Sequence, residues 1–135
     1  MPDTQYRDSS LDRAVALLGP LEGRIMRALW SGTLQTLNVV RDIQALMPEL
    51  AYTTVMTTLN RLSDKGILDV HRDVPQKAHP YSVAVTPDEF LQRTSRDEVA
   101  QIVERFGEAA IAAFAERLDG LSAEQLAHLR KLGHR

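Results

Sequence analysis

Residues 53–61 of the 135-residue chain include short polar side chains whose types and spacing suit contacts with a nucleic acid. Hydroxyl groups reach phosphates or bases, threonine methyls contact the thymine methyl, and asparagine can bond adenine through two atoms. This segment therefore predicts an interface with double-stranded DNA. Its candidate DNA-binding residues are Thr53, Thr54, Met56, Thr57, Asn60 and Arg61.

A helix from about Tyr52, ended by Gly66, is predicted to position these residues. At 100° per residue, three further apolar side chains fall within about 40° of Val55, which makes a narrow stripe for a core. They are Ala51, Leu59 and Leu62. The opposite side carries Thr53, Thr57, Asn60 and Asp64, flanked by Thr54, Met56 and Arg61. A merely solvated face is usually rich in Glu and Lys, and threonine is a poor helix former, so the threonines favour DNA contact. The alternative is that Thr53 only caps the helix and the others are neutral surface.

Two helices are predicted before this one. The first runs from Pro20 to about Trp30, with proline in the favoured first position. After a few extended residues, the second is capped by Thr36 and stopped by Pro48. Its apolar side would consist of Leu37, Val40, Ile43 and Met47.

After the third helix the pattern changes to that of β-structure. Residues 67–72 and 81–85 predict two strands, joined by a loop at 73–80. Helix, short strand, helix, helix, strand, loop, strand is the order of a winged helix-turn-helix. The wing holds basic residues that we expect to contact phosphate or the minor groove, unless it is an ordinary exposed hairpin. They are Arg72, Lys77 and His79.

The C-terminal part is predicted to be a helical dimerisation region. A capping box at Thr86 and Glu89 starts a long helix, which continues past a weak point at Gly107 to Leu118. A second box within residues 122–125 starts the last helix. The apolar side chains here exceed what one small winged domain can cover, so we expect a homodimer. They include Phe90, Val99, Ile102, Val103, Phe106 and Phe114.

The predicted fold class is mainly α with a small β wing, comprising a winged helix-turn-helix domain and a C-terminal helical region. Residues 1–18 form an N-terminal arm, 19–86 the winged-helix DNA-binding domain, and 87–135 the dimerisation region. In the arm, a short helix at 9–18 has one apolar face that should pack on the rest of the chain. The first 87 residues have no net charge, and the remainder carries −2.

Composition excludes several classes of protein. The chain is 44% hydrophobic and 25% charged, which is typical of a globular protein, and it has no cysteine for disulfides, thiolate zinc sites or nucleophiles. No apolar run approaches the roughly 20 residues of a membrane span. The polar N-terminus lacks the core of a secretory signal, so we expect a cytoplasmic protein.

Three other functions are weighed against DNA binding alone. An enzyme is not expected, because the four histidines are scattered and no glycine-rich phosphate loop is present. No cofactor or metal is expected either. A winged helix that binds protein remains an alternative, favoured by the charge neutrality of residues 1–87. A third alternative adds a small-molecule, metal or haem effector, through His71 and His79 or through His128 and His134.

The run from Ala51 to Gly66 resembles the penicillinase-repressor (BlaI/MecI/CopY) family of bacterial transcription repressors. Its strongest element is Tyr-Thr-Thr-Val-Met-Thr-x-Leu-x-Arg-Leu-x-x-Lys-Gly, and residues 21–30 and 77–81 are also similar to the family pattern. The resemblance covers about residues 19–132. It implies a winged-helix homodimer that is held by C-terminal helices and binds dyad operators with TACA/TGTA-like half-sites. Family members repress β-lactamase, methicillin-resistance or copper-homeostasis genes.

The chain departs from this family pattern at its switch elements. Antibiotic-responsive members are cut at an Asn-Phe bond in the dimerisation region, whereas the corresponding bond here is Arg105-Phe106. The C-terminal cysteine motif of the copper-responsive branch is absent. We therefore expect release from DNA through an effector, a different protease site or a falling protein level.

Overall fold

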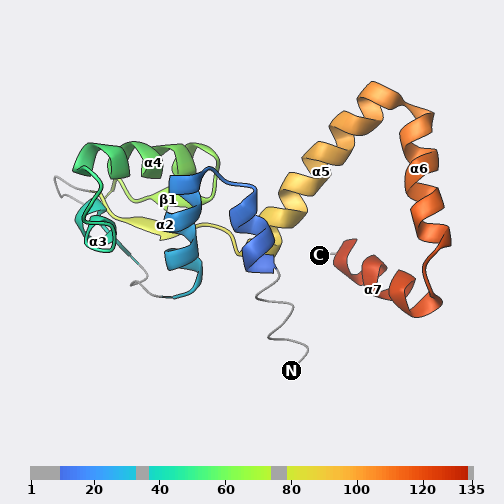
Figure 1. The fold of residues 1–135 in the computed structure, drawn as a ribbon, viewed down its shortest axis with the longest axis horizontal. Coiled ribbons are helices and arrows are strands. Elements are labelled where there is room, and N and C mark those ends of the chain that lie inside the picture. Colours follow the sequence, from blue (N-terminus) through green and yellow to red (C-terminus); the bar gives the residue numbers. More distant parts are fainter. Residues whose placement is uncertain (1–9, 33–36, 74–78, 134–135) are drawn as a thin grey trace. The chain divides into compact units, whose positions relative to one another are not determined.

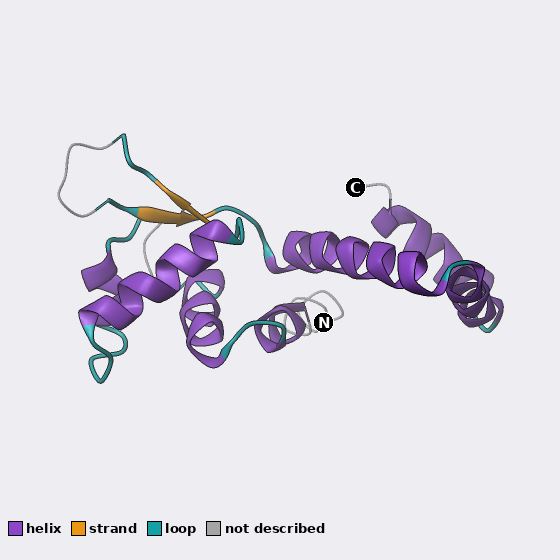
Figure 2. Cartoon of the chain, turned by 90° about the horizontal axis from the view of Figure 1, so that it is seen from above, coloured by secondary structure: helices purple, strands orange, loops and turns teal. Residues whose placement is uncertain are grey.

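The computed structural model describes residues 10–32, 37–73 and 79–133 (Figure 1). The chain divides into two compact units between Arg93 and Thr94. The first unit is built of helices and a small antiparallel sheet, and the second unit is helical (Figure 2). This confirms the predicted fold class.

The first unit has the order of elements expected of a winged helix. After the helical arm, three helices precede two antiparallel strands, in which Leu68 lies opposite Val83 and Val70 lies opposite Tyr81. Asn38 forms an isolated antiparallel bridge to Tyr81, which confirms the short extended segment after the first helix. The elements are α2 (Pro20–Trp30), α3 (Val40–Gln44), α4 (Tyr52–Asp64), β1 (Leu68–Val70) and β2 (Tyr81–Val83).

The core of this unit lies between the three helices and β1. The predicted stripe of α4 is largely confirmed, because Val55, Leu59 and Leu62 are fully buried. Ala51 is an exception: it is exposed, since it precedes the helix as an extended N-cap residue. The largest fully buried side chains are Ile25, Met26, Ile43, Val55, Leu59, Leu62, Ile67 and Leu68.

The predicted start of the second helix is wrong. Thr36, the expected cap, lies outside the described residues, and the cap position of α3 is Val39. Leu37, expected on the apolar side, is exposed and not helical. The reason is a long-range pairing: the Asn38 N–H donates to the Tyr81 carbonyl at 3.0 Å, and the Tyr81 N–H donates to the Asn38 carbonyl at 2.7 Å. The backbone before α3 is therefore extended.

Three elements are also shorter than predicted. α3 ends at Gln44, so Met47 is buried from a turn after the helix and not from the helix itself. The strands cover only the middle of 67–72 and the start of 81–85. A backbone hydrogen bond continues the hairpin beyond the two strands: the Ala84 N–H donates to the Ile67 carbonyl at 2.9 Å.

The predicted helix end at Gly66 is confirmed. Lys65 is the C-cap residue, and Gly66 follows with φ +74°. The Ile67 N–H donates to the Leu62 carbonyl at 3.0 Å and turns the chain into β1. Arg93 covers this turn, because its guanidinium donates to the Lys65 carbonyl at 3.1 Å.

Replacing Gly66 with alanine is expected to lower the free energy of unfolding by about 1–2 kcal/mol, the cost of a left-handed conformation with a Cβ. Denaturant titration followed by circular dichroism measures the loss. Gly32→Ala is the matched control, since Gly32 has φ +77° with open space around its Cβ position, whereas a Cβ at Gly66 would lie 3.3 Å from the Arg93 side chain. Similar losses in both variants identify the backbone as the cause. An unchanged Gly66→Ala protein would contradict the prediction.

The first turn of α5 (Pro87–Phe106) is attached to this unit. The predicted capping box is confirmed: the Glu89 N–H donates to Thr86 Oγ1 at 3.1 Å, and the Thr86 N–H donates to Glu89 Oε1 at 3.2 Å. The Trp30 indole donates to the Val85 carbonyl at 2.9 Å, and its ring lies 5.9 Å from that of Phe90. Trp30 therefore fixes the start of α5.

The N-terminal arm is helical at residues 10–16. Ala14 is fully buried in the core and Leu18 packs against it, which confirms the predicted apolar contact of the arm. The carboxylate of Asp12 pairs with Arg27 of α2 at 3.0 Å.

The second unit holds the rest of α5 followed by α6 (Glu108–Asp119) and α7 (Ala123–Gly133). The prediction of one helix through Gly107 is wrong, because Gly107 has φ +63° and separates α5 from α6. The second capping box is confirmed: the Gln125 N–H donates to Ser122 Oγ at 3.1 Å, and the Ser122 N–H donates to Gln125 Oε1 at 2.9 Å. Among the described helices, none has the length and apolar character of a membrane span.

Candidate nucleic-acid interface

The polar residues of α4 lie on its outer side. Thr53, Thr57, Asn60 and Arg61 are exposed, Met56 is 36% exposed, and Thr54 is half-buried. We call this set of six the polar face of α4. The buried apolar stripe fixes it, because the same helix turns Val55, Leu59 and Leu62 into the core.

Thr58 does not belong to this face. Its side chain is 5% exposed, and its hydroxyl donates to the Thr54 carbonyl at 2.8 Å, one turn earlier in the helix. The sequence counts it among the clustered threonines, but its role is packing, since the hydroxyl is satisfied within the helix.

Three arginines near this face are available for an anionic partner. Arg41, Arg61 and Arg72 are exposed and form no ion pair with another described residue. Other basic side chains of the unit are neutralised: Lys65 pairs with Glu22 at 2.7 Å, and Arg24 pairs with Glu49 at 2.6 Å. Pairing thus leaves these three arginines as exposed cations, in segments that also expose the carboxylates of Asp64, Asp69 and Asp73.

Arg41 was not recognised from the sequence as a binding residue. It lines a groove of about 550 Å³ together with Gln44, Ala45, Pro48 and Tyr52, which lies between α3 and the first residue of α4. Backbone N–H groups at a helix N-terminus attract anions. The local sequence pattern did not distinguish Arg41, because its place beside Tyr52 depends on how α3 packs against α4.

The structure describes two of the three predicted wing residues, Arg72 and His79. Arg72 follows β1 and is exposed, and Lys77 lies outside the described residues. His79 is half-buried, and its Nδ1 is buried without a hydrogen-bond partner in the described part of the chain. His71 is engaged in the hairpin, where its Nε2 lies 2.7 Å from Ser82 Oγ.

The alternative of a metal effector would use His71 as a ligand, and its Nε2 is instead within hydrogen-bond distance of Ser82. Within the described ranges, no group of three or more His, Cys, Asp or Glu side chains could hold a metal ion.

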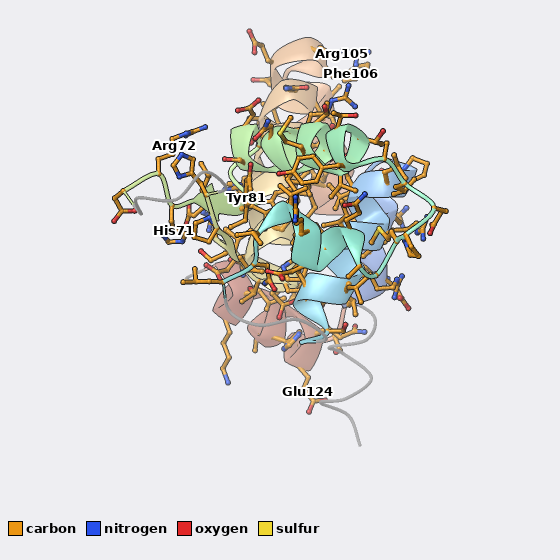
Figure 3. All side chains as sticks on the ribbon, turned by 90° about the vertical axis from the view of Figure 1, so that its left-hand side faces the viewer. His71, Arg72, Tyr81, Arg105, Phe106 and Glu124 are labelled. Atoms are coloured by element: carbon orange, nitrogen blue, oxygen red, sulfur yellow. The ribbon has the colours of Figure 1, made fainter. Side chains whose placement is uncertain are left out.

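Tyr81 joins the wing to the polar face of α4. Tyr81, labelled in Figure 3, is 6% exposed. Its hydroxyl donates to Asn60 Oδ1 at 2.8 Å. Burial raises the pKa of Tyr81 above the ordinary 10.0, partly offset by the positive charge of Arg72, so the hydroxyl is protonated and can donate at neutral pH. Sequence reasoning treated Tyr81 only as a strand residue. Its contact crosses 21 positions in the sequence, which no local pattern reveals.

The arrangement of α2, α3, α4 and the hairpin defines a winged-helix protein with a helix-turn-helix. The sequence model described as penicillinase repressor matches residues 18–134. The chain belongs to this family. It is 37% identical over 111 residues to a protein named transcriptional regulator BlaI from Mycobacterium tuberculosis, covering 81% of this chain and 79% of the relative.

Two solved structures are also similar to the chain. One is M. tuberculosis Rv0081, with a TM-score of 0.42 and 21% identity over 78% of this chain and 96% of the other. The second is the apo form of wild-type MarR from E. coli, with a TM-score of 0.44 and 12% identity over 96% and 87% of the two chains. At these scores we draw no conclusion from either.

Proposed function

We propose that this protein is a transcriptional repressor that binds palindromic operator DNA as a homodimer. The observation that supports it best is the polar face of α4, which exposes threonine, asparagine and arginine on the side opposite a fully buried apolar stripe. A helix of this kind fits the major groove, where hydroxyl and amide groups meet base edges. Membership of the penicillinase repressor family supports the same function.

The side chains of the interface would divide between base reading and phosphate contact. Thr53, Thr57 and Asn60 would read bases, with Thr54 and Met56 beside them. The cationic residues would hold phosphates, which fixes the register of a protein on the duplex without reading its sequence. This second group comprises Arg61 and Arg72, Lys77 and His79 in the wing, and Arg41 beside the N-terminus of α4.

A second copy of the chain is the proposed partner of the helical unit. Ile111, Phe114 and Leu118 recur on one side of α6 and are 56%, 39% and 44% exposed. Phe106 and Leu129 add exposed apolar area in the same unit, at 57% and 43%. Soluble monomers rarely expose such contiguous apolar stripes. A dimer through this unit would carry two copies of α4 to the two halves of a palindromic site.

Mobility shift on DNA at several salt concentrations tests the proposed function. The probe is a duplex that the chain enriches from a randomised library. Binding should weaken steeply with salt, with a slope near −0.9 per phosphate contacted, and Arg72→Ala should reduce that slope by about 1. Failure of the chain to enrich or bind any duplex at low salt would contradict the proposed function. That result would favour a winged helix that binds protein, which the charge neutrality of residues 1–87 also suits.

Release from DNA is proposed not to depend on a cut between Arg105 and Phe106. The bond lacks the asparagine found in the cleaved relatives, and the Arg105 guanidinium lies 5.0 Å from the centre of the Phe106 ring (Figure 3). In cells exposed to a β-lactam, immunoblotting should therefore detect the full-length chain and no fragment that ends at residue 105. A discrete fragment of that length would contradict the prediction.

A further inference from the structure

The Tyr81 residue is held by backbone pairing on both sides. It lies opposite Val70 of β1, and two backbone hydrogen bonds of 3.0 and 2.7 Å join it to Asn38. The ring is buried, with 6% exposure, so the phenol has little freedom to move. Its hydroxyl ends at Asn60 Oδ1, 2.8 Å away, on an exposed residue of the neighbouring helix.

The Asn60 amide has two chemically different ends. Its oxygen is an acceptor with two lone pairs, and its nitrogen carries two donor hydrogens. The torsion that exchanges the two ends is broad, so an exposed asparagine samples both orientations. In the structure the Tyr81 hydroxyl donates to the oxygen, and this contact holds one orientation. With Tyr81 at one lone pair, the second lone pair and the NH₂ group remain for a base.

We propose that Tyr81 is a positioning residue for sequence recognition, which holds the Asn60 amide oriented for a base edge while itself touching no DNA. This inference rests on the proposed function. Adenine offers an N6 donor and an N7 acceptor in the major groove, which the free lone pair and the NH₂ group of Asn60 match. The base preferred opposite Asn60 is therefore adenine, and its selection depends on a residue of the wing.

Tyr81→Phe tests this role, because it removes the hydroxyl and keeps the buried ring. The probes are the duplex enriched by the wild-type chain from a randomised library, the same duplex with each A·T pair replaced in turn, and a shuffled duplex. Fluorescence anisotropy should show about 3- to 10-fold weaker binding of the enriched duplex, the effect of one net hydrogen bond. Affinity for the shuffled duplex and the salt slope should not change. Discrimination should fall mainly at one A·T position.

Ser82→Ala is the matched control. It deletes a side-chain hydrogen bond of 2.7 Å, to His71, from the same strand, and that bond does not reach α4. The ratio of affinities for the enriched and shuffled duplexes should stay at the wild-type value. Equal thermal melting of the two variants and the wild type checks that the hairpin is intact.

A double-mutant cycle separates positioning from general stability. In the Asn60→Ala background, Tyr81→Phe should not lower the affinity ratio further, because the group it orients is gone. Fully additive losses would overturn the inference, as would an unchanged ratio in Tyr81→Phe or an equal loss on both duplexes. A wild-type chain that enriches no sequence would overturn the proposed function as well, so the two failures are distinguishable.

Discussion

Replacing Ile111 and Phe114 together with aspartate is expected to convert the proposed homodimer into a monomer and to weaken binding of a two-site duplex by roughly 100-fold or more. Linking two DNA-binding units multiplies affinity by about 10²–10⁴, and that gain is lost when the link breaks. Both side chains are exposed apolar groups on one side of α6, so a carboxylate there would have to be desolvated at the interface. Light scattering at micromolar concentration and anisotropy on the enriched duplex measure the two effects.

Ala112→Asp is the control for this variant. Residue 112 is exposed and lies 100° around α6 from Ile111, so a carboxylate is added to the same helix away from the stripe. It should remain a dimer with unchanged affinity. Binding of a single half-site should be equal in all three proteins, because the winged unit is untouched. A monomeric wild-type chain, or a dimeric double variant, would contradict the proposed interface.

Features encoded by neighbouring residues could be predicted from the sequence. The capping boxes at Thr86–Glu89 and Ser122–Gln125 depend only on side chains three positions apart, and both form as expected. The polar face of α4 followed from the helical period. Val55, Leu59 and Leu62 can be buried together only if the opposite side of the helix, which carries Thr53, Thr57 and Asn60, points outward.

Features that depend on long-range pairing or on the conformation of a single residue could not be predicted. Leu37 fitted the helical period of the segment to Met47, yet the pairing of Asn38 with Tyr81 keeps the chain extended there. Gly107 looked like a tolerated weak point, but it adopts a positive φ and ends the helix. In both places a local preference was overridden by backbone pairing or backbone conformation, for which an amphipathic pattern gives no signal.

The candidate site also combines residues that the sequence pattern reveals with one contact that only the folded chain reveals. Its exposed threonines and Asn60 were evident from composition and spacing, whereas Tyr81 was not, because its hydroxyl meets Asn60 only after the hairpin folds against α4. Arg72 and Lys77 look equivalent in the sequence. Arg72 is exposed and Lys77 lies outside the described residues, and phosphate contact by either residue stays a prediction.

Replacing Asn60 with alanine is expected to weaken binding of the enriched duplex by about 5- to 150-fold, which corresponds to 1–3 kcal/mol for one bidentate base contact. Binding of a shuffled duplex should fall much less, because non-specific affinity comes from phosphate contacts. Asn60 is exposed, and among the described residues its side chain hydrogen-bonds only to Tyr81, so the fold should survive the change. Anisotropy with both duplexes at one fixed salt concentration gives the two affinities.

Arg72→Ala provides the contrast to Asn60→Ala. Arg72 is exposed in the wing and pairs with no described carboxylate, so its removal should weaken both duplexes by the same factor and flatten the salt dependence. Asn60→Ala should leave the salt slope as it is and lower the ratio of the two affinities. If Asn60→Ala instead lowers both affinities equally, Asn60 does not read a base. Sequence selectivity would then reside in Thr53 and Thr57, the other outward side chains of α4 placed to reach base edges.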